Sequence, residues 1–202
     1  LSIIFNSPIG EPMASTNTRA LTSPSNDFFE LDVKKLAQEA GIEVSKVNSF
    51  TVEARPSSGN TPTRVNHQIV YKNSAIESSI NISLQNHNVI HSKSRPRTSW
   101  GQLINSSEFE SYLSLANDGH EDPVSSVQIK FYDENGFLAS EQVDVPQRSV
   151  RSVNITKMLN RQKLKASGDF LWYEYECTNY FLTAFAISRH VNSGNCTGEH
   201  SF

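Results

Sequence analysis

The chain lacks the features that mark membrane proteins and nucleic-acid-binding proteins. None of its apolar runs approaches the roughly 18 residues that a membrane-spanning helix requires. It carries 18 lysine and arginine residues against 21 aspartate and glutamate residues, a net charge of -3, so it has no basic excess to neutralise phosphates. We therefore expect no membrane insertion and no nucleic-acid partner.

Motifs of the common enzyme classes are also missing. The sequence contains no glycine-rich phosphate loop and no G-x-S-x-G nucleophile motif. Cys177 follows an aromatic segment that has no neighbouring histidine to act as its base. We expect no cofactor and no enzymatic activity.

Cysteine is scarce, with Cys177 and Cys196 as its two examples. If residues 170–177 pair antiparallel with residues 181–191, the two thiols lie at opposite ends of a hairpin, about 25 Å apart. The five residues that follow Val191 can return at most about 17 Å, and a disulfide needs Cα atoms within about 7 Å. We predict two free thiols.

Two groups of residues have side chains of the types that bind metals. His190, Cys196 and His200 follow an H-x5-C-x3-H spacing, which differs from that of the common zinc motifs. Asp133 and Glu134 are typical first ligands of a calcium loop, but the later ligands are missing. We expect a hairpin turn at Asp133 and no bound metal. A hydrolase or metal site that uses His190 and His200 is the alternative.

What the sequence does contain is a β-strand pattern, clearest in residues 127–159. Val127, Ile129 and Phe131 alternate with polar residues, which predicts a strand with one buried face. The turn residues of DENG follow, and a returning strand begins directly after them. Asn154 then stands where it can cap a short helical turn. The pattern predicts a strand pair followed by a helix.

The first part of the chain repeats this pattern. Three pairs of segments match in fixed order: 2–15 with 127–140, 29–36 with 152–159, and 50–60 with 185–195. In the second pair, Asp32 takes the place of Asn154, and Gly41 and Gly168 end the two helices. We expect an all-β fold of two tandem immunoglobulin-like or jelly-roll-like β-sandwich units, each with one short helical turn.

The expected units are residues 1–104 and 105–202, joined by a connector at residues 91–105. The first has no counterpart of the strand at 110–117, so its first strand is missing or supplied elsewhere. The second ends before a counterpart of the strand at 79–84. Such sandwiches leave open sheet edges, and we expect Ile3 and Phe5 to lie on one of them. Either the two units complete each other within one chain, or neighbouring chains donate the strands. We favour the second, a homo-oligomer assembled through open sheet edges.

Residues 100–190 carry a series of motifs in fixed order: Trp100, ESYLSLANDG from Glu110, VQIKFYDENG from Val127, the VPQRSV bend, Asp169-Phe170, and a last strand that ends in Arg189-His190. In this order they resemble the small soluble transducer family of microbial sensory rhodopsins. The resemblance implies a β-sandwich that oligomerises, has no catalytic activity, serves in signalling, and is suggestive of carbohydrate-binding modules.

The segment FLWYEYEC, residues 170–177, is unusually aromatic. In a strand, Phe170 and Trp172 share one face, and Leu171, Tyr173 and Tyr175 share the other. One face must belong to the core. The other is either a packing contact or a platform on which a sugar ring or peptide stacks.

Polar residues end two strands that the repeat makes equivalent, and these strand ends are a second candidate site. The complete set of candidate ligand-binding residues is Arg55, Trp100, Trp172, Tyr173, Tyr175, Arg189 and His190.

From these observations we expect a non-catalytic binding or assembly module that recognises a carbohydrate or protein partner. It is expected to be secreted or at the cell surface, with a cytoplasmic location as the alternative. The alternative function, implied by the family resemblance, is a soluble signal-transducer module that docks on a membrane receptor.

Overall fold

The structure, a computed structural model, describes residues 2–17, 30–53, 65–72, 77–84, 97–117, 124–179 and 182–200. In these residues strands predominate, all paired antiparallel, with two short α-helices, α1 (Val33–Glu39) and α2 (Ile155–Arg161), and one 3-10 turn, η1 (Val44–Lys46). The expected all-β fold is confirmed. None of the helices that the structure describes has the length and hydrophobicity needed to cross a membrane.

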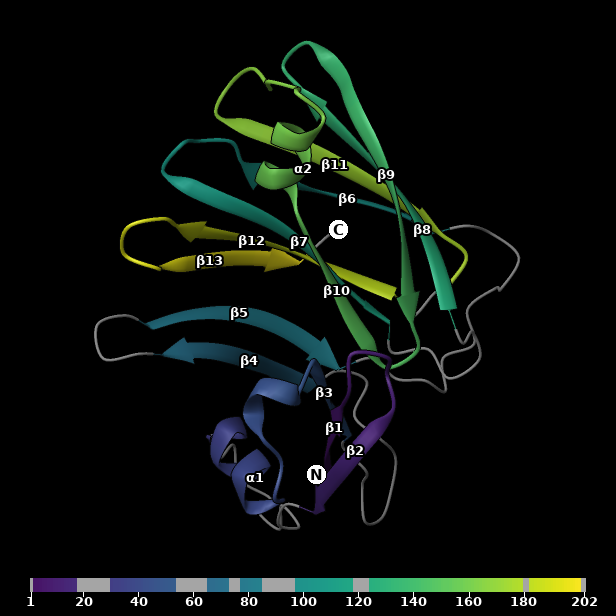
Figure 1. Cartoon of the computed structure of the whole chain (residues 1–202), viewed down its shortest axis with the longest axis vertical. Helices are drawn as coiled ribbons and strands as arrows, with labels where there is room; N and C mark the ends of the chain where they lie inside the picture. The colour runs from purple at the N-terminus through teal and green to yellow at the C-terminus, as the bar shows by residue number, and fades with distance from the viewer. Residues whose placement is uncertain are drawn as a thin grey trace.

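Two four-stranded sheets form a sandwich in the C-terminal part of the chain (Figure 1). The first sheet has the order β6-β11-β8-β9, with bounds Arg97–Ile104, Phe170–Cys177, Val124–Asp133 and Gly136–Pro146. The second has the order β10-β7-β12-β13, with bounds Ser149–Asn154, Phe109–Asn117, Leu182–His190 and Cys196–His200. We call the first of them the β11 sheet, after the strand that pairs with both β6 and β8.

The strand order is immunoglobulin-like in its centre and different at its ends. The second strand of the sandwich, β7, pairs with the fifth, β10, and the third, β8, pairs with the sixth, β11, as in an immunoglobulin domain. However, the first strand, β6, pairs with β11, and the seventh, β12, pairs with β7. In immunoglobulin domains the first strand pairs with the second and the seventh with the sixth. The first and seventh strands have therefore exchanged sheets.

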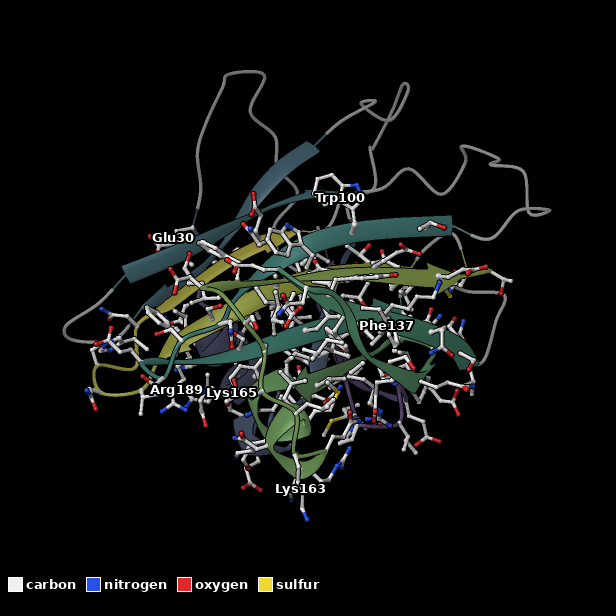
Figure 2. The ribbon with its side chains drawn as sticks, turned by 90° about the horizontal axis from the view of Figure 1, so that it is seen from above. Glu30, Trp100, Phe137, Lys163, Lys165 and Arg189 are labelled. Atoms are coloured by element: carbon white, nitrogen blue, oxygen red, sulfur yellow. The ribbon has the colours of Figure 1, made fainter. Side chains whose placement is uncertain are left out.

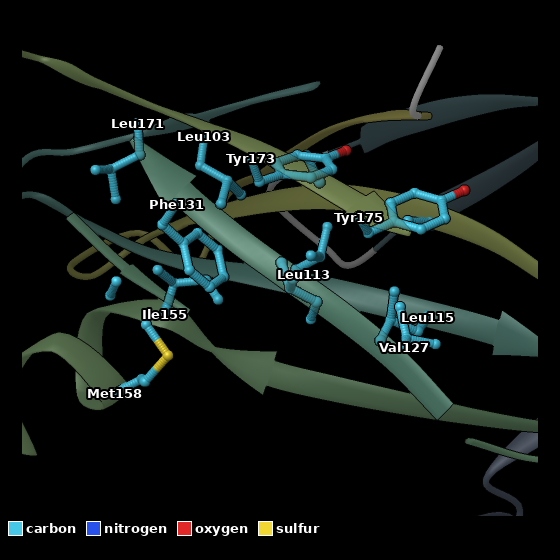
Figure 3. Packing of buried hydrophobic residues seen from close by; sticks show 14 of the residues in the cluster. Leu103, Leu113, Leu115, Val127, Phe131, Ile155, Met158, Leu171, Tyr173 and Tyr175 are labelled. Atoms are coloured by element: carbon cyan, nitrogen blue, oxygen red, sulfur yellow. The ribbon is translucent and has the colours of Figure 1, made fainter. Parts of the chain in front are cut away.

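The core of the sandwich comes from strict alternation on facing strands (Figure 3). Leu113 and Leu115 on β7 are completely buried against Phe131 on β8 and Tyr173 on β11. Helix α2 adds Ile155 and two further apolar side chains to the same cluster. Each fully buried side chain of this size contributes about 1.5–3 kcal/mol. This core fixes which face of β11 points outward.

The N-terminal residues form a smaller sheet with the order β2-β1-β3. Its strands are β1 (Ser2–Asn6), β2 (Pro12–Asn17) and β3 (Ser49–Glu53). Ile3, Phe5, Ala37 of α1 and Ile42 make its core. A separate hairpin, β4 (Val65–Lys72) with β5 (Glu77–Leu84), lies with β5 beside β13 (Figure 1).

The small sheet and the β11 sheet share a register. In both, a phenylalanine on the central strand pairs with an alanine on one side and an aromatic residue on the other: Phe5 with Ala14 and Phe50, Phe131 with Ala139 and Tyr173. In both hairpins the register shifts directly after that phenylalanine. The strands β1, β2 and β3 therefore hold the positions of β8, β9 and β11.

The two helices also begin and end alike. Their first-turn cap bonds run from the Lys35 N–H to Asp32 Oδ1 at 3.0 Å and from the Lys157 N–H to Asn154 Oδ1 at 2.8 Å. After each helix one residue has positive φ, Gly41 at 72° and Lys163 at 58°. The expected match of Gly41 with Gly168 is wrong. The residue with positive φ that follows α2 is Lys163, and Gly168 lies in the next loop.

Two further expectations about strand positions are wrong. The segment at 50–53 belongs to β3, which pairs with β1 as β11 pairs with β8, so its counterpart is β11 and not the strand at Phe185. Residues 97–104, expected in a connector, form β6 and contribute Leu103 to the core. The second sandwich therefore includes residues before the expected boundary at 104/105. The reason is long-range pairing with β11, which local sequence does not reveal.

The expected open edge at Ile3 and Phe5 is also wrong. β1 is the central strand of its sheet, and these side chains are 1% and 0% exposed. Partners on both sides remove the basis for assembly through this strand.

Both cysteines are free thiols, as predicted, but the expected hairpin geometry is wrong. β11 pairs with β6 and β8, whereas β12 lies in the opposite sheet. The chain crosses from one sheet to the other between these strands and does not fold back as a hairpin.

Gly101 on β6 leaves room for the ring of Tyr173 on the neighbouring strand. A Cβ atom at Gly101 would lie 2.7 Å from Cζ and 2.9 Å from Cε1 of that ring. Tyr173 is 1% exposed and has no space to swing outward. We predict that Gly101→Ala lowers the free energy of unfolding by about 1–3 kcal/mol, the usual range for overpacking. Urea unfolding measures it, with exposed Gln102→Ala as the control, and an unchanged midpoint would contradict the packing described.

Candidate functional site

A row of aromatic side chains crosses three adjacent strands, β11, β8 and β9, on the outer face of the β11 sheet. Trp172 on β11 lies directly opposite Tyr132 on β8, and Tyr132 lies directly opposite Phe137 on β9. The core contains Leu171, Tyr173 and Phe131. Successive side chains of a strand point to opposite faces, so Trp172 and Tyr132, which are adjacent to them in sequence, point outward. The Tyr132 and Phe137 rings meet edge to face, with centroids 5.9 Å apart. We call Trp172, Tyr132 and Phe137 the aromatic row.

Two more aromatic residues extend this surface. Phe170 precedes Trp172 by two residues on β11. Trp100 lies on β6, diagonally from Trp172. The exposed fractions are 64% for Phe137, 57% for Trp100, 43% for Phe170 and 39% for Trp172. Figure 2 labels Trp100 and Phe137, which project from the two edge strands of the sheet. Among the described residues, every exposed large aromatic side chain therefore lies on this one sheet.

A second row, parallel to the first, is polar on β11 and β8 and ends on β6 at Trp100, which lies directly opposite Glu174. Glu174 lies opposite Lys130, and their side chains form an ion pair at 3.6 Å. Both side chains are more than one third exposed, so the ion pair contributes at most about 1 kcal/mol. Glu176 and Asp144 add exposed carboxylates farther along the sheet. Among the described side chains of this face, carboxylates thus outnumber ammonium groups.

The β8-β9 turn, which carries the end of the aromatic row, is held by Asp133. Asp133 Oδ2 accepts from the Ser167 N–H at 2.9 Å and Oδ1 from the Asn135 N–H at 2.8 Å. The hydrogen bond from Ser167 and, to a smaller extent, that from Asn135 lower the pKa of the Asp133 carboxyl below its usual value. Oδ1 thus closes the turn, and Oδ2 ties the turn to the loop between α2 and β11. The hairpin expected at Asp133 is present.

The structure divides the predicted ligand-binding residues between surface and core. Trp100 and Trp172 lie on the exposed face. Tyr173 and Tyr175, each 1% exposed, belong to the core, so their assignment as ligand-binding residues is wrong. The strand alternation that exposes Trp172 necessarily buries both tyrosines.

The second predicted site, at the strand ends, does not assemble around a ligand in the described residues. Arg189 forms an ion pair with Glu110 at 3.7 Å, and Glu110 accepts from the Tyr112 hydroxyl at 2.8 Å. Partial burial, followed by this hydrogen bond, raises the pKa of Tyr112. His190 packs edge to face on Phe109, with ring centroids 5.2 Å apart. Arg55 lies outside the described residues.

The histidines also give no metal centre in the part of the chain that the structure describes. His190 Nδ1 accepts from the Ser193 N–H at 3.2 Å and lies 3.0 Å from its Oγ, so this nitrogen belongs to the β12-β13 turn. The His200 backbone ends β13 opposite Phe185, and its side chain is outside the described residues.

Sequence reasoning missed Tyr132 and Phe137. Their signal was present: Tyr132 follows inward-pointing Phe131 and must point outward, and Phe137 lies at the start of the returning strand. What the sequence did not show is that β11 pairs with β8, which places Trp172 beside Tyr132.

The N-terminal sheet uses the equivalent face for a contact within the chain. Its residues at the positions of the aromatic row are Ser49, Asn6 and Pro12, and Asn6 is completely buried. Ser49 Oγ donates to the Arg148 carbonyl at 2.9 Å, and the neighbouring Asn48 Nδ2 donates to the Val150 carbonyl at 3.0 Å. The β9-β10 turn thus covers this face.

The β9-β10 turn and strand β10 each make a further contact with the N-terminal hairpin. Arg151 Nη1 donates to the Pro8 carbonyl at 2.9 Å, and a side chain at Gly10 would collide with the carbonyl of Gln147. The equivalent face of the β11 sheet carries aromatic rings and stays exposed.

Comparison with family models, with curated proteins and with solved structures finds no significant match for this chain.

We predict that Asp133→Asn weakens the fold, because an amide has one acceptor oxygen for the two N–H groups that the carboxylate satisfies. The lowered pKa also has a pH consequence. A carboxyl whose pKa is lower in the folded state stabilises the fold above its unfolded pKa, about 3.9, and loses that contribution as the pH falls through the folded value. Urea midpoints at pH 7 and pH 3 should differ less for Asp133→Asn than for the native chain. Exposed Asp169→Asn is the control, and an equal pH dependence in all three proteins would contradict the role of Asp133.

Proposed function

We propose that this protein is a non-catalytic module that binds a carbohydrate chain on the outer face of the β11 sheet. The observation that carries the proposal is the aromatic row, in which Trp172, Tyr132 and Phe137 occupy directly paired positions on three adjacent strands. A sugar ring has an apolar face of C–H groups and a polar edge of hydroxyls. The apolar face stacks on an aromatic ring, and the hydroxyls form hydrogen bonds with polar side chains beside that ring.

The arrangement of polar groups supports this assignment. Glu174 and Lys130 lie one row away from Trp172 and Tyr132, at the distance of two residues along each strand, about 7 Å. Gln102 lies directly opposite Trp172 on its other side. A carbohydrate stacked on the aromatic row therefore meets carboxylate, ammonium and amide groups along its edges.

Two other classes of ligand fit this face less well. Single-stranded nucleic acids also stack on aromatic rings, but they need a positively charged surface, whereas Glu174, Glu176 and Asp144 outnumber Lys130 here. A stable protein partner needs about 800 Å² on each side, with an apolar centre. On β8 and β9 the aromatic surface is one residue wide, and it has charged neighbours, which suits a narrow chain better.

The N-terminal sheet supplies an independent argument. At the positions equivalent to the aromatic row, Asn6 and Ser49 are already covered by the β9-β10 turn. The same place on this type of sheet thus accommodates another segment. In the N-terminal sheet these positions are polar and bind a segment of polypeptide. In the β11 sheet they are aromatic, and we propose that they bind a sugar. A carbohydrate ligand implies a module that works outside the cell or at its surface.

We predict that Trp172→Ala weakens carbohydrate binding about tenfold or more, the effect of losing roughly 1.4 kcal/mol of stacking. Affinity electrophoresis in gels that contain hydroxyethylcellulose or glucomannan, with chitin powder for depletion assays, measures the change. Ile9→Ala is the matched control, since Ile9 is an exposed apolar side chain on the N-terminal hairpin.

The native chain and Ile9→Ala should be retarded equally, and Trp172→Ala should be retarded much less at the same polysaccharide concentration. Failure of the native chain to bind any of these glycans, or equal binding by Trp172→Ala, would overturn the proposal. Tight binding of a proline-rich peptide by the same face, lost in Trp172→Ala, would also overturn it in favour of a peptide-binding module.

A further inference from the structure

We infer that the ligand is a neutral, extended, β-1,4-linked polysaccharide chain that lies across the strands of the β11 sheet, and that one chain contacts Trp172 and Phe137 together. This inference rests on the proposed function and adds the direction, the linkage and the charge of the ligand.

The direction follows from the register. Trp172, Tyr132 and Phe137 are neighbours across β11, β8 and β9, so the aromatic row runs perpendicular to the strands. Adjacent strands lie about 4.8 Å apart, which places Trp172 and Phe137 roughly 10 Å from each other. Along β11 in the C-terminal direction Trp172 is followed on the same face by Glu174 and Glu176, which offer no ring for stacking. On the N-terminal side Phe170 gives β11 one further ring, so the strand direction offers two rings in line and the aromatic row offers three. A ligand that stacks on the largest number of rings in line therefore crosses the strands.

The linkage follows from the spacing of the rings in the row. Two contacts roughly 10 Å apart correspond to sugar rings separated by about one disaccharide unit. An equatorial β-1,4 linkage gives an extended ribbon whose rings can rest on one surface over that distance. Chains with α-1,4 linkages coil and turn successive rings away from a flat surface. Trp100, diagonal to Trp172 on β6, continues the surface beyond the row for a longer chain.

The charge of the ligand follows from the side chains that flank the row. Lys130 is already paired with Glu174, and Glu176 and Asp144 leave an excess of negative charge on the described part of this face. A polysaccharide with one carboxylate per sugar would meet repulsion at close range. A neutral chain meets hydrogen-bonding groups only.

The test uses isothermal titration calorimetry of the whole chain with cellobiose and cellohexaose. The native protein should bind cellohexaose at least about tenfold more tightly than cellobiose, because only the longer chain reaches from Trp172 to Phe137. Phe137→Ala should remove most of that difference and leave cellobiose binding nearly unchanged. Trp172→Ala should weaken both ligands, and Ile9→Ala should weaken neither.

The charge is tested with a hexamer of β-1,4-linked mannuronate, which has the same linkage and a carboxylate on every unit. We expect no measurable binding at concentrations that saturate the protein with cellohexaose. Tighter binding of the mannuronate hexamer, or equal affinity for cellobiose and cellohexaose, would overturn this inference while the proposed function stands. Binding of none of the three ligands, with hydroxyethylcellulose, glucomannan and chitin also failing to bind, would remove both.

Discussion

The alternation of side chains along β11 is the constraint on which the rest of the sandwich depends. Leu171, Tyr173 and Tyr175 are buried, while Phe170 and Trp172 between them are exposed. Because β11 pairs on both sides, with β6 and β8, a shift of one residue would move every one of these side chains to the opposite face. The glycine at position 101 then accommodates a ring that no other residue there would allow. Core packing and surface chemistry are therefore set by one register.

Much of this was predictable from local sequence patterns. The period of two in β8, the DENG turn and the assignment of Phe170 and Trp172 to one face all follow from neighbouring residues. The capping positions of Asp32 and Asn154 were also predictable, since an N-cap needs only a side chain that reaches three residues ahead. The repeated hairpin and helix were recognisable for the same reason.

The remaining features depend on contacts between distant segments. Leu103 and Trp100 were expected near a connector, because nothing around them shows that β6 pairs with residues about 70 positions later. The exposed edge expected at Phe5 became a central strand once β3 paired with β1. The aromatic row itself requires three strands, of which sequence reasoning identified one member, Trp172. Predicting the rows of a sheet needs the strand order, and the strand order is a long-range property.

Strand β9 joins two distant parts of the surface. One end carries Phe137 in the aromatic row, and the other leads into the turn at Arg148 that sits on the N-terminal sheet. β9 therefore gives a direct covalent path from Phe137 to the turn that is hydrogen-bonded to the N-terminal sheet. β8 is paired with β9 along the whole length of β9. If β9 were pulled along its axis, all the hydrogen bonds between the two strands would therefore resist at the same time.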